Sequence, residues 1–187
     1  RFDLSRYWQL DMATPSVVDE DTDELLERLE EAVKLRMIAD VPLGAFLSGG
    51  VDSSMVVGLM SRNSDKPVET CSVGSDVPEF DESGYAQNVA DHFGAHHRMR
   101  LISAHDASLI DVMPDVFDEP FADMSALPTY RVCALARETV KVALSGDGGD
   151  ELFGGYRRYR LHMMEEQFRS AIPHMVRRAV FGPLSKV

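Results

Sequence analysis

Two short apolar segments, each followed by a loop rich in glycine and acidic residues, constrain the fold of this chain more than any other feature. Residues 43–47 (LGAFL) lead into the loop SGGVDSS at 48–54, and residues 140–145 (VKVALS) lead into GDGGDE at 146–151. Strands that are apolar on both faces are typical of parallel sheets buried between helices. In such sheets ligands bind beyond the carboxyl ends of the strands, so the two loops are expected to border one site.

Strand-like and helical segments alternate along the rest of the chain. Apolar residues recur at helical spacing from Asp21 to about Ala39, and Pro42 ends that helix. Other helices are expected at 53–62, 83–93, 104–112 and 125–138 and beyond Asp150, and other strands at 68–74 and 96–102. This alternation predicts an α/β fold: a doubly wound parallel sheet with helices on both faces.

Composition excludes several classes of protein. A net charge of −12 disfavours nucleic acid as a partner, and the basic cluster Arg157, Arg158 and Arg160 is too small to outweigh it. No apolar stretch approaches the roughly 20 residues of a membrane-spanning helix, and no signal peptide is visible. Cys71 and Cys133 have no metal-type spacing, so we expect two buried thiols in a cytoplasmic protein.

The first loop has the composition of a phosphate-binding turn. Two glycines let the backbone curl, and the amides of the turn and of the following helix N-terminus converge on one spot. The loop contains neither GK[ST] nor GxGxxG, so it is not a P-loop of the kinase type or a dinucleotide-binding turn. The alternative is a Gly-Gly turn that merely joins a strand to a helix.

The second loop carries acidic side chains that suit a hard cation. Asp147, Asp150 and Glu151 lie among glycines, and carboxylate oxygens are ligands that Mg²⁺ prefers. Asp52 from the first loop and Asp150 from the second are the candidates to hold Mg²⁺ together. The spacing does not fit an EF-hand. The alternative is an acidic turn in water.

Two other groups are expected to be structural. His96 and His97 are adjacent in a predicted strand, so their rings face opposite sides of the sheet and cannot share a metal. Phe153, Tyr156 and Tyr159 fit packing in the core or at its rim.

The motifs together resemble a known family. SGGVDSS resembles the pyrophosphate-binding loop of the ATP pyrophosphatases, which have the adenine nucleotide alpha hydrolase-like fold. Residues 145–156 (SGDGGDELFGGY) closely resemble the signature of the glutamine-hydrolysing asparagine synthetases. Residues 118–123 (DEPFAD), 127–130 (LPTY) and 6–8 (RYW) resemble the same family. The resemblance implies a lead-in at 1–18 and, at 19–187, the N-terminal portion of a synthetase domain.

The resemblance also implies roles for individual residues. Asp52 and Asp150 would hold Mg²⁺, Asp147 would help to form or use an acyl-adenylate, and Glu151 would support Mg²⁺ or the substrate. The ATP-binding set would be Leu47, Ser48, Gly49, Gly50, Asp52, Ser53, Val73, Ser145 and Gly146. Within this set, the residues of the first loop would hold the pyrophosphate, and Leu47, Val73, Ser145 and Gly146 would border adenine and ribose. Asp123 and Ser125 lie in a resembling segment but receive no role.

The implied reaction is ATP-dependent synthesis of asparagine. The side-chain carboxylate of aspartate attacks the α-phosphorus of ATP, and ammonia then displaces AMP. The family obtains ammonia from glutamine in a separate glutaminase domain with an N-terminal cysteine, and it uses a lysine from beyond the region matched here. We therefore expect this chain to be inactive by itself, and a homodimer is possible. The alternatives are a related amidotransferase acting on another carboxylate and a nucleotide-binding module without catalysis.

Overall fold

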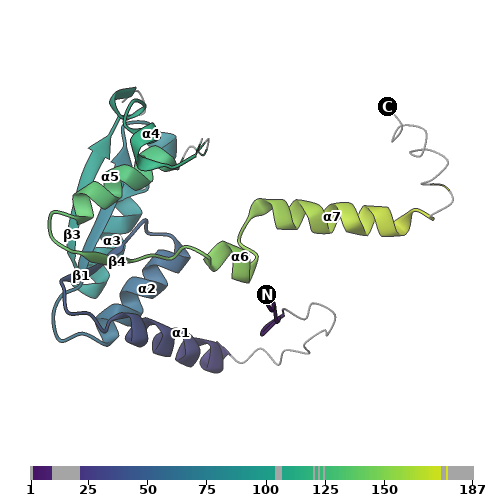
Figure 1. The fold of residues 1–187 in the computed structure, drawn as a ribbon, viewed down its shortest axis with the longest axis horizontal. Helices are drawn as coiled ribbons and strands as arrows, with labels where there is room; N and C mark the ends of the chain where they lie inside the picture. Colours follow the sequence, from purple (N-terminus) through teal and green to yellow (C-terminus); the bar gives the residue numbers. More distant parts are fainter. Residues whose placement is uncertain are drawn as a thin grey trace.

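The computed structural model confirms the α/β architecture, and it describes residues 2–9, 22–103, 107–119, 121, 123, 125–173 and 176 (Figure 1). The strands are β1 (Leu43–Phe46), β2 (Glu69–Ser75), β3 (His96–Ile102) and β4 (Val142–Leu144). The helices are α1 (Thr22–Arg36), α2 (Val51–Arg62), α3 (Ser83–Phe93), α4 (Met113–Val116), α5 (Ala126–Ala136), α6 (Gly149–Phe153) and α7 (Arg157–Ala171), with 3-10 turns η1 (Pro78–Phe80) and η2 (Ala107–Leu109).

The sheet topology brings the two glycine-rich loops together. The strand order is β3-β2-β1-β4, and every pairing is parallel. β1 and β4 are neighbours, with Leu43 opposite Val142 and Ala45 opposite Leu144. Because parallel neighbours end at the same edge of a sheet, the loops that follow β1 and β4 start side by side.

Two apolar clusters, one on each face of the sheet, form the core. The larger joins the sheet to α1, α2 and α3 and includes Leu47, Val57 and Ala86. The smaller joins it to α5 through Cys71 and Leu135, with the half-buried Phe46 against it. Leu47 is only 1% exposed, so the residue that precedes the first loop is fixed in the core.

Most predicted elements are confirmed. Helix α3 has the expected bounds and ends at Gly94, whose φ of +64° lies in the left-handed region that glycine tolerates. Helix α2 begins at Val51, two residues earlier than expected. Residues 2–9 of the predicted lead-in form no helix or strand, while residue 1 and residues 10–18 lie outside the described residues.

The helix expected at 104–112 is wrong over its described part. Residues 107–109 form the 3-10 turn η2, and the short α4 starts only at Met113; residues 104–106 lie outside the described residues. Pro114 accounts for the start of α4, because proline cannot continue a helix but fits the first turn of a new one.

Two expectations of burial are also wrong. Among the described residues β4 is an edge strand, and Val142 is 40% exposed, so this strand is not buried on both sides. Cys133 is an exposed free thiol, whereas Cys71 is buried as expected. On α5, Leu135 and Ala136 pack against the sheet, and Cys133 lies on an exposed side of the helix.

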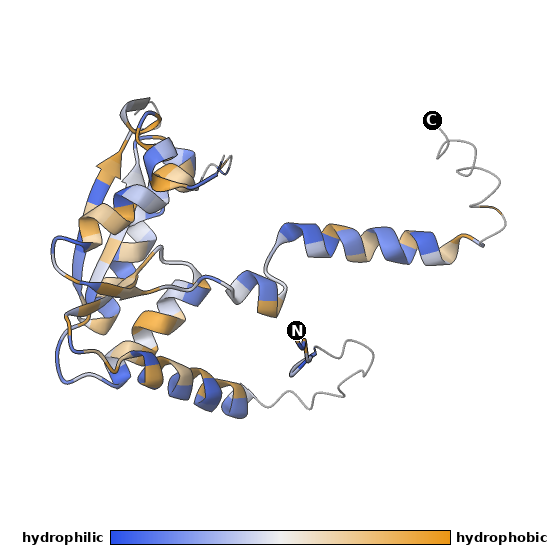
Figure 2. Cartoon of the chain, viewed as in Figure 1, coloured by the Kyte–Doolittle hydropathy of each residue, from blue (hydrophilic) through white to orange (hydrophobic). Residues whose placement is uncertain are grey.

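The chain leaves the sheet at its second loop. Figure 1 shows α6 and then α7 extending away from the body of the sheet. Figure 2 shows hydrophilic and hydrophobic residues intermixed along α7, and its large apolar side chains Leu161, Met164 and Phe168 are exposed. None of the helices in the described residues combines the length and the apolarity needed to cross a membrane.

Candidate functional site

The first loop is held in shape by its own serines. Ser48 Oγ lies 3.0 Å from Ser53 Oγ and accepts the amide of Gly50 at 3.2 Å. Ser53 Oγ accepts the amide of Ser48 at 3.3 Å. Two of the amides expected to face a phosphate are therefore engaged within the loop. The amides of Val51, Asp52 and Ser53 lie in the first turn of α2, where the backbone has no intrahelical acceptor, and they remain the candidate donors.

Gly49 is required for a reason that the sequence does not reveal. Its φ is +83°, and an added Cβ would lie 2.5 Å from the carbonyl carbon of Tyr85 and 2.6 Å from the amide nitrogen of Ala86. The N-terminal turn of α3 thus packs directly on the loop. A side chain at residue 49 would be excluded by protein backbone, whether or not a ligand is bound.

Glycines of the second loop bring it into contact with the first. An added Cβ at Gly146 would lie 2.7 Å from the amide nitrogen of Ser53, and one at Gly149 would lie 2.5 Å from Asp52 Oδ2. In this loop the left-handed backbone geometry belongs to Gly148, with φ +94°, and not to Gly149. The backbone of Gly149 therefore rests against the Asp52 carboxylate, and the two loops form one surface.

A cavity of about 900 Å³ opens along this surface. The residues that line it include most of the predicted site: Ser48, Gly50, Asp52, Ser53, Ser145, Gly146, Asp147, Asp150 and Glu151. Among the described residues in the lining, every charged side chain is acidic. Glu82 is an acidic lining residue that lies outside the two loops. Asp52 and Asp150 thus border the same cavity from adjacent strand ends. The described residues contain no cluster of three or more His, Cys, Asp or Glu side chains suited to a metal.

Two of the three remaining predicted residues border a second, smaller cavity of about 290 Å³, whereas Gly49 lines neither cavity. Leu47 and Val73 line it from the ends of β1 and β2. The two cavities share five lining residues: Phe46, Ser48, Glu82, Thr129 and Val132. Ser48 was predicted, and Thr129 lies in a resembling segment, but no local pattern marks Phe46, Glu82 or Val132 as site residues.

Tyr156 is a site residue that the sequence reasoning assigned to packing. Its hydroxyl donates a hydrogen bond of 2.5 Å to Glu151 Oε1, and both residues line the larger cavity. This bond is the main reason that the pKa of Glu151 lies below its ordinary value and the pKa of Tyr156 above its own. The guanidinium of Arg158 lies 4.2 Å from the centre of the Tyr156 ring.

Asp123 and Ser125, which had no assigned role, form the turn that precedes α5. Asp123 Oδ1 accepts the amide of Ser125 at 2.8 Å, and the Asp123 carbonyl accepts the amide of Ala126 at 3.2 Å. The bonds from Ser125 lower the pKa of the Asp123 carboxyl. Neither residue lines either cavity, so the structure gives both a local structural role.

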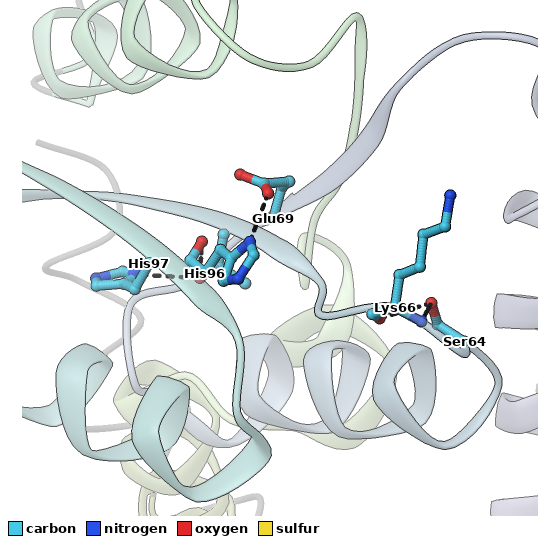
Figure 3. Close-up of polar contacts among 6 residues, drawn as sticks. Ser64, Lys66, Glu69, His96 and His97 are labelled. Carbon is cyan, nitrogen blue, oxygen red and sulfur yellow. Dashed lines mark hydrogen bonds and ion pairs between the residues drawn. The ribbon is translucent and has the colours of Figure 1, made fainter.

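His96 and His97 point to different partners, as predicted. His96 Nδ1 lies 3.0 Å from Glu69 Oε1, and the ring of His97 lies away from this pair (Figure 3). His97 is instead held by two hydroxyls of β2, with Nδ1 2.9 Å from Thr70 Oγ1 and Nε2 3.0 Å from Ser72 Oγ. The two rings therefore have separate side-chain partners.

Comparison with known proteins identifies the family of this chain. The sequence matches the family described as asparagine synthase over residues 24–186. A Methanocaldococcus jannaschii protein whose name assigns it to the glutamine-hydrolyzing asparagine synthetases is 42% identical over 177 residues, which are 91% of this chain and 33% of that protein. Asparagine synthetase (glutamine-hydrolyzing) 1 of Bacillus subtilis is 38% identical over 151 residues, 78% of this chain and 23% of its own length.

A relative with a different name and a solved structure with the same fold are also similar to this chain. Amidase chry2 of Gibberella zeae is 30% identical over 166 residues, 79% of this chain and 24% of that protein. The solved NH3-dependent NAD synthetase of Campylobacter jejuni, in complex with nitrate, shares the fold with a TM-score of 0.50 at 13% identity, covering 72% of this chain and 60% of that one. The chain spans a third or less of the length of these sequence relatives. On its match over residues 24–186, this chain belongs to the asparagine synthase family.

Proposed function

We propose that this chain binds ATP for a ligase that adenylates the side-chain carboxylate of aspartate and converts it to an amide with ammonia. The observation that carries the proposal is the contact between the two loops: Gly149 rests against the Asp52 carboxylate, and both loops border one cavity of about 900 Å³. That volume is in the range of sites for small molecules. In a longer protein, ammonia would come from glutamine through a glutaminase domain, as the names of the sequence relatives suggest.

The first loop and α2 suit the phosphates of ATP. The amides in the first turn of α2 point out of the helix, and the positive end of the helix dipole favours an anion there. The hydroxyls of Ser48 and Ser53 are already oriented by their mutual hydrogen bond. In this proposal the smaller cavity, with Leu47 and Val73, receives the adenine, and Ser145 and Gly146 border the ribose.

The acidic lining suits a bound Mg²⁺ ion. A nucleoside triphosphate would be repelled by a cavity whose charged side chains are all acidic unless a cation lies between them. Mg²⁺ is held in proteins by one or two carboxylates together with the phosphates, so the pair Asp52 and Asp150 fits without a larger cluster. When bound, the ion would supply positive charge against the phosphates. The two carboxylates would fix it between the loops.

The reacting groups are then arranged by the second loop. The acceptor carboxylate attacks the α-phosphorus, pyrophosphate leaves, and ammonia attacks the acyl carbon to release AMP. In this proposal Asp147 and Glu151, on the wall of the cavity, face the acceptor and the incoming ammonia. Holding the reactants in line is the main contribution of such a site to the rate.

Calorimetry tests the binding step directly. We expect Mg²⁺-ATP to bind the wild-type chain, and Asp52→Asn or Asp150→Asn to weaken binding about tenfold or more when Mg²⁺ is present. Without Mg²⁺ the same changes are expected to have little effect or to strengthen binding, because they remove negative charge. Asp65→Asn, in the exposed loop beyond the other end of α2, is the matched control. Unchanged Mg²⁺-dependent affinity in both site variants would contradict the metal assignment.

A second candidate is amide formation on a carboxylate other than aspartate. It is favoured by the similarity to amidase chry2, a relative that is not named as an asparagine synthetase. Pyrophosphate release by a protein that contains this chain together with the remainder of the synthetase domain, measured with ammonium and a panel of carboxylates, separates the two. Release that requires aspartate supports the first function, and release with another acceptor supports the second. Silence with every acceptor, despite ATP binding, would indicate a module without catalysis.

A further inference from the structure

The segment from Asp150 to Arg158 folds back on itself and brings Tyr156 next to Glu151, a side chain that lines the cavity. Helix α6 ends at Gly154, whose φ is +70°. The amide of Gly155 donates to the carbonyl of Asp150 at 3.1 Å, and a Cβ at Gly155 would collide with the Asp150 carboxylate. The double glycine therefore reverses the chain over a single turn of helix and returns Tyr156 to Glu151, five residues earlier.

We propose that Tyr156 is the positioning residue for Glu151, and that its hydroxyl, 2.5 Å from Glu151 Oε1, holds the carboxylate at the wall of the larger cavity to meet a cationic group of the substrate complex. The inference rests on the proposed function for the identity of that complex. Glu151 is exposed and its side chain would otherwise sample several rotamers, at an entropic cost whenever it binds. A fixed hydrogen bond removes part of that cost before the ligand arrives.

The tyrosine is itself held in place. The Arg158 guanidinium lies 4.2 Å from the centre of its ring, a favourable cation–π arrangement, and the Tyr159 ring lies 5.7 Å away. The charged groups around the Tyr156 hydroxyl are Glu151, Asp150 and Arg158. Glu151 raises the pKa of the hydroxyl most strongly, Asp150 raises it further, and Arg158 lowers it.

The cationic group has two possible sources. One is the metal of Mg²⁺-ATP, since Glu151 follows Asp150 directly in the chain. The other is the ammonium group of an amino-acid acceptor. Both are recognised by an ionised carboxylate with fixed direction, and the tests below separate them.

The first test needs no ligand, so it remains decisive even if the chain does not bind ATP. Tyrosine ring carbons are followed by NMR against pH, with the Tyr156 signal assigned from its loss in Tyr156→Phe. We expect Glu151→Gln to lower the pKa of Tyr156 towards its ordinary value, because the negative acceptor is removed. Glu165→Gln, an exposed acid of α7, is the matched control. An unchanged Tyr156 titration in Glu151→Gln would overturn the proposal.

The second test compares ligand binding in Tyr156→Phe, Glu151→Gln and the double variant. Loss of one hydrogen bond is expected to weaken binding about two- to tenfold in Tyr156→Phe, with no further loss when it is added to Glu151→Gln. Tyr159→Phe, which changes the neighbouring ring outside the cavity lining, should bind normally.

The arms of this experiment identify the cationic group. A loss with Mg²⁺-ATP that disappears without Mg²⁺ assigns it to the metal. A loss that appears only when aspartate is added to Mg²⁺-ATP assigns it to the ammonium group. Full binding by Tyr156→Phe in every arm, or additive losses in the double variant, would show that the tyrosine serves only the junction between α6 and α7.

Discussion

The two glycine-rich loops are equally recognisable in sequence but differ in how the fold supports them. The first lies between β1 and α2, and the apolar residues around it reach into the core from both faces of the sheet. The second follows the edge strand β4, and the helix after it exposes 81% of Leu152 and 57% of Phe153. The second loop is located mainly by its contacts with the first, through Gly146 and Gly149. A recognisable motif can thus be held in place without a core of its own.

The largest expected effect compares a leucine from each region. Leu47→Ala removes a side chain that is 1% exposed and should lower the free energy of unfolding by about 2–5 kcal/mol. Leu152→Ala removes an exposed side chain and should change it by no more than about 0.5 kcal/mol. Chemical denaturation followed by circular dichroism measures both. Equal losses would show that α6 packs as firmly as the first loop.

A second prediction concerns the contact that joins the regions. Gly149→Val places a branched side chain against the Asp52 carboxylate, and we expect Mg²⁺-ATP affinity to fall at least about tenfold in a protein that still folds. Gly84→Ala is the control, because a Cβ there meets nothing within 4 Å. Calorimetry on both variants, with circular dichroism for folding, provides the measurement. Wild-type affinity in folded Gly149→Val would mean that the loops can separate without harm to the site.

The comparison also explains what could be predicted from the sequence. Local sequence patterns predict the positions of the strands, the closeness of the two loops and the bounds of α3. The spacing of apolar residues, the helix-capping residues and the alternation of strands with helices can all be recognised in short segments of the chain. The reason for Gly49 could not be predicted, because it is the backbone of Tyr85, 36 positions away by residue number. The Glu151–Tyr156 bond was missed for a different reason: it depends on how sharply Gly154 and Gly155 turn the chain.

The smallest expected effect is on the pH dependence of stability and concerns His97, in the same sheet as the strand that precedes the first loop. Its ring is held between Thr70 and Ser72, of which Thr70 is fully buried. Burial lowers the pKa of His97 because it disfavours the charged ring, while Asp91 of α3 acts weakly in the opposite direction. The unfolded chain, with a histidine pKa near 6.5, therefore binds a proton more readily than the folded chain. The folded state should be fully stabilised above about pH 6.5 and should lose that stability as the pH falls towards the lower folded value.

His97→Gln tests this linkage, because glutamine keeps one donor and one acceptor near the two hydroxyls but cannot titrate. We expect the wild type to lose more stability than His97→Gln when denaturation is compared at pH 7.5 and at successively lower pH, so that the two curves converge towards acid. Below the lowered folded-state pKa of His97 the curves should run in parallel again, since the ring is then protonated in both the folded and the unfolded chain. Carboxylates with lowered pKa values, such as Asp81, reduce stability equally in both proteins. His162→Gln, which removes an exposed imidazole from α7, serves as the matched control in the second region. A constant difference between wild type and His97→Gln across the whole range would mean that the ring takes up its proton as readily in the folded sheet as in the unfolded chain, and that the two hydroxyls accept the charged form without cost.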